Sequence, residues 1–273
     1  MKEYFILSDI HSFYDEMIAA LNRENFDINN PEHIIIVCGD LLDRGPKSKD
    51  VVSFFYDLYN KDRAILIRGN HEDLFDEIIK YGEYHSYDFS NGTMKTLGQL
   101  NTPEMSSSRV ALLFEDAIYG YDRRWDFLRK NMINYKEIGN YIFVHGWIPV
   151  KDDNDIDSKN FMGVLYDPEW RNANREDWDN ARWLNGMKYA SEGILEPGKT
   201  IVCGHWHTSY GHTKRKIRET KNYSLSDFDE DADFSIFYDN GIIAIDACTA
   251  HSGFCNCLHL TEEQMYETKN NNS

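Results

Sequence analysis

Residues 34–45 read IIIVCGDLLDRG, a short apolar run that ends in a cluster of charged residues. A continuous apolar run of this length, closed by Gly and Asp, is typical of a strand that is buried on both faces of a parallel sheet. The carboxylates of Asp40 and Asp43 and the guanidinium of Arg44 follow directly after it. The stretch therefore predicts a buried strand whose carboxyl end carries charged side chains.

Similar runs recur along the chain, and segments with helical spacing follow the first three of them. The apolar runs lie at residues 4–7, 34–38, 64–67, 141–144, 200–203 and 242–245. The helical segments lie at residues 14–23, 49–59 and 72–81. Strands that alternate with helices in this way predict a βαβαβα unit with a largely parallel sheet. The sequence thus predicts an α/β protein.

Strand signals nearly vanish between residues 83 and 136, where the pattern is helical. The helical stretches expected there are 95–100, 108–117 and 125–131. We expect this segment to form a mainly helical cap or insertion within a single domain that spans residues 1–273. The Asp- and Asn-rich stretches 151–160, 171–180 and 226–233 are expected to be loops.

The composition excludes several classes of protein. The chain has 273 residues, with 41% hydrophobic and 27% charged residues, which is the balance of a globular protein rather than a disordered or fibrous one. It has 29 Lys and Arg against 46 Asp and Glu, so its formal net charge is −17. This excess of negative charge argues against nonspecific binding to nucleic acids or to anionic membranes. Small soluble partners are favoured instead.

The cysteine content and the lack of long apolar segments point to a cytoplasmic protein. No stretch approaches the apolar length of a membrane span, and the first residues have no secretory signal pattern. The cysteines are odd in number, and without a secretory signal they are expected to be reduced thiols. They are Cys38, Cys203, Cys248, Cys255 and Cys257.

The polar residues that follow the predicted strands carry the chemistry. Ligands of open α/β sheets bind outside the carboxyl ends of the strands, so these side chains should converge on one crevice. Taken singly, each motif has a plainer interpretation as a helix cap, a turn or a buried histidine. Together they provide two carboxylates, four imidazoles and an amide, which suit two Mn, Fe or Zn ions better than Mg or Ca. These donors are Asp9, Asp40, His11, His145, His205, His207 and Asn70.

The same residues form motifs that resemble a known superfamily. They are Asp-x-His at residues 9–11, Gly-Asp-x-x-Asp-Arg-Gly at 39–45, Gly-Asn-His-Glu at 69–72, His-Gly at 145–146 and Gly-His-x-His at 204–207. Together they resemble the calcineurin-like metallophosphoesterases, in particular the phosphoprotein-phosphatase branch with its bacterial and phage Ser/Thr phosphatases and diadenosine tetraphosphatases. The resemblance implies a metallophosphoesterase-type β-sandwich flanked by helices, with a helical cap.

The resemblance also implies a site with two divalent metal ions, with manganese favoured and iron or zinc as alternatives. In this family the first metal would be bound by Asp9 and His11 and both metals by Asp40. The second would be bound by Asn70, His145 and His205. His207 would be an extra ligand, because the wider superfamily uses the second histidine of Gly-His-x-His.

The implied reaction is attack of a metal-bridging hydroxide on a phosphate ester. His71 would protonate the leaving oxygen, Asp43 would orient the imidazole, and Arg44 would bind the phosphate. Arg68 and Arg182 are further candidates for phosphate binding, and a structural ion pair is an equal alternative for Arg68.

Smaller features of the sequence leave alternatives open. Ser8 and Ser12 stand where the family usually has glycines beside Asp-x-His. The turn at residues 91–93 either contacts the substrate or begins the next helix. Three aromatic residues of the cap pack its core or stack on a base; they are Tyr119, Tyr121 and Trp125.

The sequence leaves the substrate open among three functions. A phosphomonoesterase of the Ser/Thr protein phosphatase kind is the first reading, with a phosphorylated protein or a small phosphoester as its partner. A symmetrical dinucleoside polyphosphate hydrolase is the alternative, in which the helical segment would shape a nucleotide pocket. A metal- and phosphate-binding protein without catalysis is the third, although all the expected ligand positions are filled.

Overall fold

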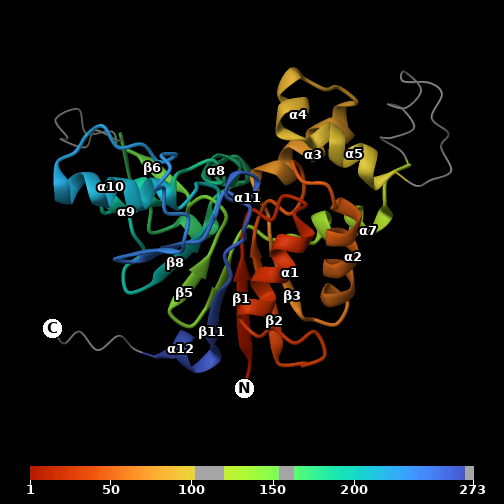
Figure 1. The fold of residues 1–273 in the computed structure, drawn as a ribbon, viewed down its shortest axis with the longest axis horizontal. Helices are drawn as coiled ribbons and strands as arrows, with labels where there is room; N and C mark the ends of the chain where they lie inside the picture. The colour runs from red at the N-terminus through yellow and green to blue at the C-terminus, as the bar shows by residue number, and fades with distance from the viewer. Residues whose placement is uncertain (102–119, 154–162, 268–273) are drawn as a thin grey trace.

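Two β-sheets pack face to face at the centre of the molecule, with helices on their outer faces (Figure 1). The computed structural model describes residues 1–101, 120–153 and 163–267. The first sheet has the strand order β11-β1-β2-β3 and the second the order β4-β5-β8-β10-β9. The chain is therefore an α/β sandwich flanked by helices. The apolar runs predict a largely parallel sheet for the first third of the chain, which the first sheet confirms, and the structure places the later central strands in a second sheet.

The first sheet is the βαβαβα unit expected from the sequence. Strands β1, β2 and β3 are parallel, and β11 joins the edge of β1 antiparallel. The strands are β1 (Glu3–Leu7), β2 (His33–Cys38), β3 (Ala64–Ile67) and β11 (Leu258–Thr261). The helices that connect them are α1 (Tyr14–Arg23), α2 (Ser48–Tyr59) and α3 (Asn70–Tyr81). Their observed bounds agree with the predicted segments to within two residues.

The second sheet has a parallel centre and antiparallel edges. Strand β8 pairs in parallel with both β5 and β10, while β4 and β9 pair antiparallel at the two edges. The strands are β4 (Lys136–Ile138), β5 (Tyr141–Phe143), β8 (Thr200–Cys203), β9 (Phe237–Asp239) and β10 (Ile242–Ala244). A separate hairpin is formed by β6 (Val150–Asp152) and β7 (Val164–Tyr166). The three central strands are those expected from the apolar runs.

The two faces of each strand explain why both sheets are buried. Successive side chains of a strand point to opposite faces. Phe5 and Leu7 of β1 pack among the helices. Tyr4 and Ile6 face the second sheet, where Phe143 is one of their neighbours in the core. The apolar run of β2 thus fills both the helical layer and the space between the sheets, which is why it has no polar side.

Helices of the second half cover the outer face of the second sheet (Figure 1). They are η1 (Trp170–Asn172), α8 (Arg175–Ala181), α9 (Gly186–Ser191) and α10 (Ser209–Thr220), and the chain closes with α11 (Thr249–Ser252) and α12 (Glu262–Tyr266). The loop prediction for 171–180 was wrong, because Asn174 caps α8 and Trp178 is buried beneath it. The loop prediction for 226–233 is confirmed. None of the described helices is long and apolar enough to cross a membrane.

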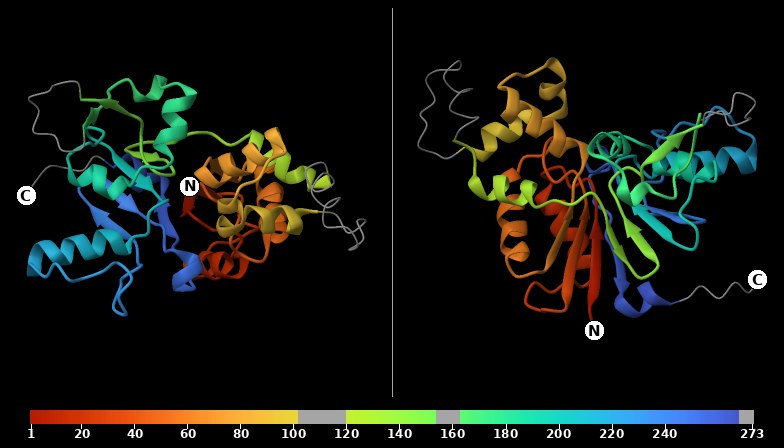
Figure 2. Two further views of the ribbon diagram at one scale, coloured as in Figure 1. Left: turned by 90° about the horizontal axis from the view of Figure 1, so that it is seen from above. Right: turned by 180° about the vertical axis from the view of Figure 1, so that it is seen from behind.

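The described part of segment 83–136 is helical up to β4. It contains α4 (Ser86–Asn91), α5 (Thr93–Leu100) and α7 (Arg123–Lys130), and the expected helix at 108–117 lies outside the described residues. Figure 2 shows α4 and α5 beside the first sheet and on the opposite side of the molecule from α10. Tyr121 and Trp125 are buried, and both pack edge-on against Phe75. These two aromatic residues therefore pack the core, and Tyr119 lies outside the described residues.

Candidate metal centre and active site

The loops after β1, β2 and β8 have a backbone conformation that is rare for residues other than glycine. Asp9, His11, Asp40, Asp43 and His205 all have positive φ angles, between 48° and 77°. Such conformations cost about 1–3 kcal/mol each and persist where the surroundings hold them. Backbone hydrogen bonds supply that support here, since the Asp9 amide donates to Gly39 O and the His11 amide to Asp40 O. The side chains after the strands are thereby fixed at the end of the sandwich.

Asp40 lies at the centre of the resulting cluster. Its Oδ2 is 3.6 Å from His11 Nε2 and 3.9 Å from His71 Nε2, and its Oδ1 is 3.4 Å from His145 Nε2. Two groups of three side chains have ligand atoms that all lie within 4.8 Å of one another. The first is His11, Asp40 and His71, and the second is Asp40, His145 and His205. The buried carboxylate of Asp40 is the member they share.

Asp9 and Asn70 lie at the edges of these groups. Asp9 Oδ2 accepts a hydrogen bond from the His205 amide at 2.9 Å, and Asp9 Oδ1 is 4.0 Å from His11 Nε2. Asn70 Oδ1 is 2.8 Å from His145 Nε2. The structure therefore brings together six of the seven predicted metal ligands.

His207 is the seventh, and its contacts are elsewhere. Its Nδ1 is 2.8 Å from Ser209 Oγ, its Nε2 is 3.8 Å from Asp227, and its ring packs against Phe228. Neither group around Asp40 includes it. The contacts of His207 in the described residues give no support to its predicted role as an extra metal ligand.

Backbone carbonyls orient the imidazoles. His11 Nδ1 donates to Leu42 O at 2.9 Å, and His145 Nδ1 donates to Cys38 O at 2.8 Å. For His11, whose pKa is lowered, a ring held in this way has its lone pair on Nε2, the atom that faces Asp40. His145 Nε2 lies 2.8 Å from Asn70 Oδ1 and 3.4 Å from Asp40 Oδ1, so these three side chains converge on one place.

The electrostatics of the cluster suit cations as well. Burial lowers the pKa of His205 to about 3, and burial together with the Arg44 charge lowers the pKa of His11, so both imidazoles are neutral and able to bind a metal. Burial favours the neutral form of Asp40, but nearby imidazoles, led by His145, outweigh it and lower the pKa. Burial raises the pKa of Asp9, with a smaller contribution from the Asp40 charge. Divalent cations would relieve this crowding of buried carboxylates.

A second set of side chains adjoins the first. His71 Nδ1 donates to Asp43 Oδ2 at 2.7 Å, and the exposed Arg44 has its NH2 group 3.3 Å from His71 Nε2. Burial lowers the pKa of His71, but the charge of Asp40 and the hydrogen bond to Asp43 outweigh it, so the pKa is raised overall. The protonated form of this imidazole is therefore favoured in the folded protein.

Helix α5 of the segment 83–136 holds Asp43 in place, which the sequence did not reveal. Thr93 and Thr96 each donate their hydroxyl to a carboxylate oxygen of Asp43 at 2.7 Å. Gly92 caps the helix with φ +92°, and a Cβ there would lie 2.4 Å from the Arg44 amide nitrogen. Of the two interpretations of residues 91–93, helix entry is confirmed.

Arg68 and Arg182 are bound by carboxylates. Arg68 Nε is 2.6 Å from Asp73 Oδ1 and its NH2 group pairs with Asp76. Arg182 Nε is 2.5 Å from Asp73 Oδ2 and its NH2 group pairs with Asp179. The two guanidiniums thus share Asp73, and these contacts favour the structural ion pair for both. Their predicted role in phosphate binding finds no support in these contacts.

The serines that replace family glycines are accommodated by close packing. The Ser8 hydroxyl lies within hydrogen-bonding distance of two acceptors, Cys38 O at 2.8 Å and Asp9 Oδ2, while the Ser12 hydroxyl is 2.9 Å from that of Ser48. Gly204 provides the space, since a Cβ there would lie 1.7 Å from Ser8 Oγ and 2.2 Å from Asp9 Oδ2. Any side chain at residue 204 would therefore displace the first loop of the site.

Two buried carboxyl groups were given no role by the sequence analysis, although Glu72 belongs to one of its motifs. Glu72 accepts the amides of Asp40, Leu41 and Gly69 at 2.7–3.0 Å and so ties the loop after β2 to the start of α3. Its position three residues after Gly69 is the spacing of a capping box, a signal that was available. Asp246 is buried two residues after β10, directly after the apolar run 242–245, where the strand-end rule would have predicted a polar site residue. Burial raises its pKa, with a further contribution from Asp9.

Replacement of Glu72 by Ala is expected to lower the free energy of unfolding by about 3 kcal/mol or more, because three buried amides lose their acceptor. Urea unfolding at constant metal concentration measures the change. Glu77 lies exposed on the same helix, so Glu77→Ala is the matched control and should stay within about 0.5 kcal/mol of the wild type. An equal unfolding midpoint for Glu72→Ala and the control would contradict the role of Glu72 as a tie.

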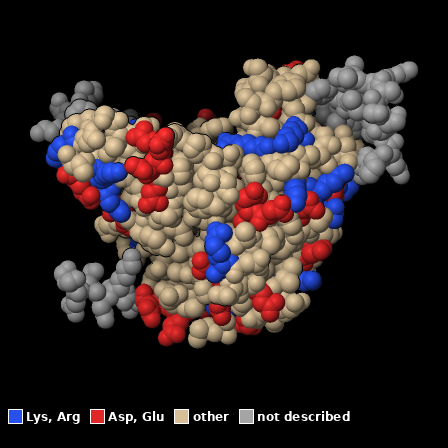
Figure 3. All heavy atoms as spheres, viewed as in Figure 1, with Lys and Arg blue, Asp and Glu red and all other residues tan. Residues whose placement is uncertain are grey.

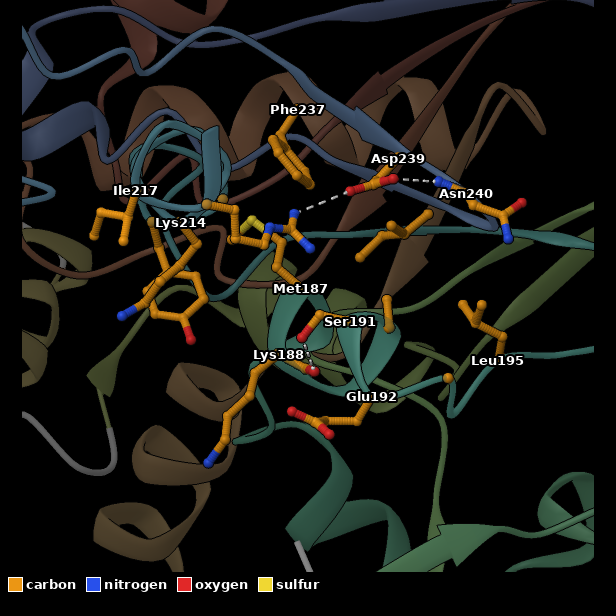
Figure 4. Close-up of a pocket in the computed structure, with 16 residues that line it drawn as sticks. Met187, Lys188, Ser191, Glu192, Leu195, Lys214, Ile217, Phe237, Asp239 and Asn240 are labelled. Atoms are coloured by element: carbon orange, nitrogen blue, oxygen red, sulfur yellow. Dashed lines mark hydrogen bonds and ion pairs between the residues drawn. The ribbon is translucent and has the colours of Figure 1, made fainter. Parts of the chain in front are cut away.

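The surface of the molecule has an indentation, with Asp and Glu side chains on its left (Figure 3), and a separate cavity. In Figure 3 the upper edge of the molecule is indented between its two halves, and Lys and Arg side chains lie along the right-hand side of the indentation. A separate cavity of about 510 Å³ lies between α9, α10 and β9 (Figure 4). None of the residues of the Asp40 cluster lines that cavity. The candidate site is thus the rim at the strand ends rather than this recess.

Comparison with known proteins agrees with the motifs. The family model for calcineurin-like phosphoesterases matches residues 4–252. An asymmetrical bis(5'-nucleosyl)-tetraphosphatase of Bacillus velezensis is 29% identical over 148 residues, which are 50% of this chain and 59% of the relative. A symmetrical bis(5'-nucleosyl)-tetraphosphatase of Buchnera aphidicola is 42% identical over 72 residues, 26% of this chain and 24% of the relative. The matched regions thus span less than two thirds of these relatives.

Solved structures align over more of the chain at lower identity. A cold-active protein tyrosine phosphatase of a Shewanella species covers 95% of this chain, and 75% of its own chain is matched, with 13% identity and a TM-score of 0.48. The match to the family model includes every member of the cluster around Asp40. The chain belongs to the calcineurin-like phosphoesterase family.

Proposed function

We propose that the protein is a divalent-metal-dependent phosphoesterase that hydrolyses dinucleoside polyphosphates. The observation that carries the proposal is the pair of His and Asp groups that share Asp40, with the His71–Asp43 pair beside them. The relatives named as tetraphosphatases support this class of substrate over a phosphoprotein. The sequence alone had favoured the protein phosphatase.

The residues that would hold two metal ions are Asp9, His11, Asp40, Asn70, His145 and His205. Their mixture of oxygen and imidazole donors fits manganese, iron or zinc, and manganese is the first choice to test. When bound, such ions supply Lewis-acid activation of water and of the phosphoryl oxygens. The lowered pKa values of His11, His205 and Asp40 favour the deprotonated forms of these side chains, which are the forms that bind a metal.

Two side chains of the protein would donate the proton and bind the phosphate: His71 and Arg44. His71 Nδ1 is held by Asp43, so Nε2 is the atom that would deliver a proton to the leaving oxygen. Arg44 lies next to that nitrogen and is exposed, which suits it to hold a phosphoryl oxygen beside the proton donor. Asp43 stabilises the imidazolium.

We also propose that segment 83–136 is an insertion in a single domain of residues 1–273. Its contribution to the site supports this, because Thr93 and Thr96 bind Asp43. A helical segment that only covered the surface would not contact Asp43, the partner of His71.

The test is to measure hydrolysis of diadenosine tetraphosphate, a phosphoserine peptide and p-nitrophenyl phosphate side by side, with manganese and with a chelator. We expect metal-dependent hydrolysis with kcat/KM at least about 10-fold higher for the dinucleotide. A preference for the phosphopeptide would contradict this proposal and identify the protein as a protein phosphatase. Metal binding without turnover of any of the three would identify a protein that has lost catalysis.

A further inference from the structure

Two exposed tryptophans, Trp183 and Trp206, each make an aromatic contact with the ring of His205. The Trp183 ring centroid is 5.7 Å from that of His205 at an interplanar angle of 85°. The Trp206 centroid is 6.1 Å from the same ring at 63°. The side chains are 51% and 37% exposed, respectively. Two indoles are therefore presented to solvent beside one member of the Asp40 cluster.

This exposure is unusual for the chain. Its six tryptophans all lie in described residues, and the other four are buried. They are Trp125, Trp147, Trp170 and Trp178. Large aromatic side chains normally dominate cores and binding surfaces because of the area that they bury. The two that escape burial are the two that contact the candidate site.

The backbone fixes both indoles at this rim. The carbonyl group of Trp183 takes part in a hydrogen bond with the His205 side chain, and the Trp183 amide donates to Asn180 O. The preceding residue, Arg182, is anchored by Asp73 and Asp179. The Trp206 amide donates to Gly204 O, and its ring contacts those of His207 and Tyr210. These contacts hold the backbone of both residues at the rim, and the ring contacts of Trp206 also restrict its indole.

We propose that Trp183 and Trp206 form a stacking platform for the nucleobase of a nucleotide whose phosphate lies at the Asp40 cluster. The inference deepens the proposed function and rests on it for the position of the phosphate. Every base has a π-face that stacks on indole, and loss of such a contact weakens binding by about 5-fold to 100-fold. Arg44 and the cluster bind the anion, and the indoles supply the recognition of the base.

The direct test is calorimetric binding of AMP and of ribose 5-phosphate, which has the same phosphate and sugar but no base, to the manganese-loaded protein. We expect AMP to bind at least about 10-fold more tightly. In Trp206→Leu and Trp183→Leu the ratio should shrink, and in the double variant it should approach one. Tyr238 is a similarly exposed aromatic on β9, so Tyr238→Leu is the matched control and should keep the wild-type ratio.

The outcomes separate this inference from the proposed function. Equal binding of the two ligands by the wild type, or an unchanged ratio in the double variant, would overturn the platform even if diadenosine tetraphosphate is hydrolysed. A clear preference for AMP that disappears in the double variant would support the platform whichever ester is hydrolysed. Tighter binding of a phosphoserine peptide than of AMP, again lost in the double variant, would make the indoles a peptide surface and contradict the inference. Bound manganese is measured in each variant.

Discussion

Asp40→Asn is expected to lower kcat/KM by about 1,000-fold or more and to reduce the bound metal at the same time. Asp40 is the one side chain shared by the two groups that could hold metals, so its replacement weakens both. Loss of an outer partner of a metal ligand already costs about 10- to 100-fold, and loss of a ligand common to two ions should exceed that. Steady-state kinetics and the metal content of the dialysed protein measure the two effects.

The substitution is suited to this test because asparagine keeps the shape of the side chain. The Oδ1 atom of Asp40 accepts the His71 amide, and an asparagine carbonyl can keep that bond. Asp57→Asn on α2 makes the same chemical change at an exposed position and should retain both metal and activity. If Asp40→Asn kept two metals and more than a tenth of the activity, Asp40 would not be the shared ligand.

The sequence predicted the strands that are buried and missed those that are not. Strands β2 and β8 are buried along their whole length, so their apolar runs were recognisable. Strand β9 has one buried residue and two exposed ones, which gives no such signal. The division into two sheets was also absent from the pattern, because an apolar run does not specify which neighbour its strand pairs with. Only the resemblance to a family indicated the sandwich.

The residues of the candidate site could be predicted where a polar side chain comes directly after an apolar run of the sequence. Asp9, Asp40 and His145 could be named because each lies just beyond an apolar run. Their supports could not, because the Leu42 carbonyl that orients His11 and the threonines that hold Asp43 come from distant segments. Such contacts depend on tertiary packing and leave no local pattern.

For the two arginines, the sequence predicted a role in the site that their contacts do not support. Arg68 and Arg182 stand near the motifs in the sequence, and a guanidinium is the group that phosphate binding needs. The carboxylates that occupy them include Asp73, whose two oxygens contact one arginine each. The residue type therefore indicated that these side chains could bind phosphate. The carboxylates that they contact instead are determined by the fold.

His71→Asn is expected to lower kcat by about 100- to 10,000-fold for esters with poor leaving groups, because the variant lacks the proposed proton donor. The decrease should be smaller for p-nitrophenyl phosphate, whose leaving group needs little protonation. Asp43→Asn should act through the pKa of His71, which Asp43 helps to raise. A proton donor works below its pKa, so activity falls as the pH rises through that value. Without Asp43 the fall should begin at lower pH, and pH–rate profiles measure the shift.

The metal content of His71→Asn decides between two roles for this imidazole. Its place beside Asp43 and Arg44 favours a proton donor, yet its Nε2 also lies among the ligand atoms of the first group. A donor predicts an inactive variant with its metals retained and with the alkaline limb of the profile removed. A ligand predicts loss of metal together with activity, and Asp43→Asn would then change metal affinity rather than the pH profile. Thr93→Val removes one hydrogen bond to Asp43 Oδ2, the oxygen that accepts His71 Nδ1, and leaves the carboxylate charge. Because that oxygen then interacts more strongly with the imidazolium, the alkaline limb should stay at its wild-type pH or move to higher pH, opposite to its movement in Asp43→Asn. A lower alkaline limb in Asp43→Asn but not in Thr93→Val, with constant metal content in both, supports the proton-donor role.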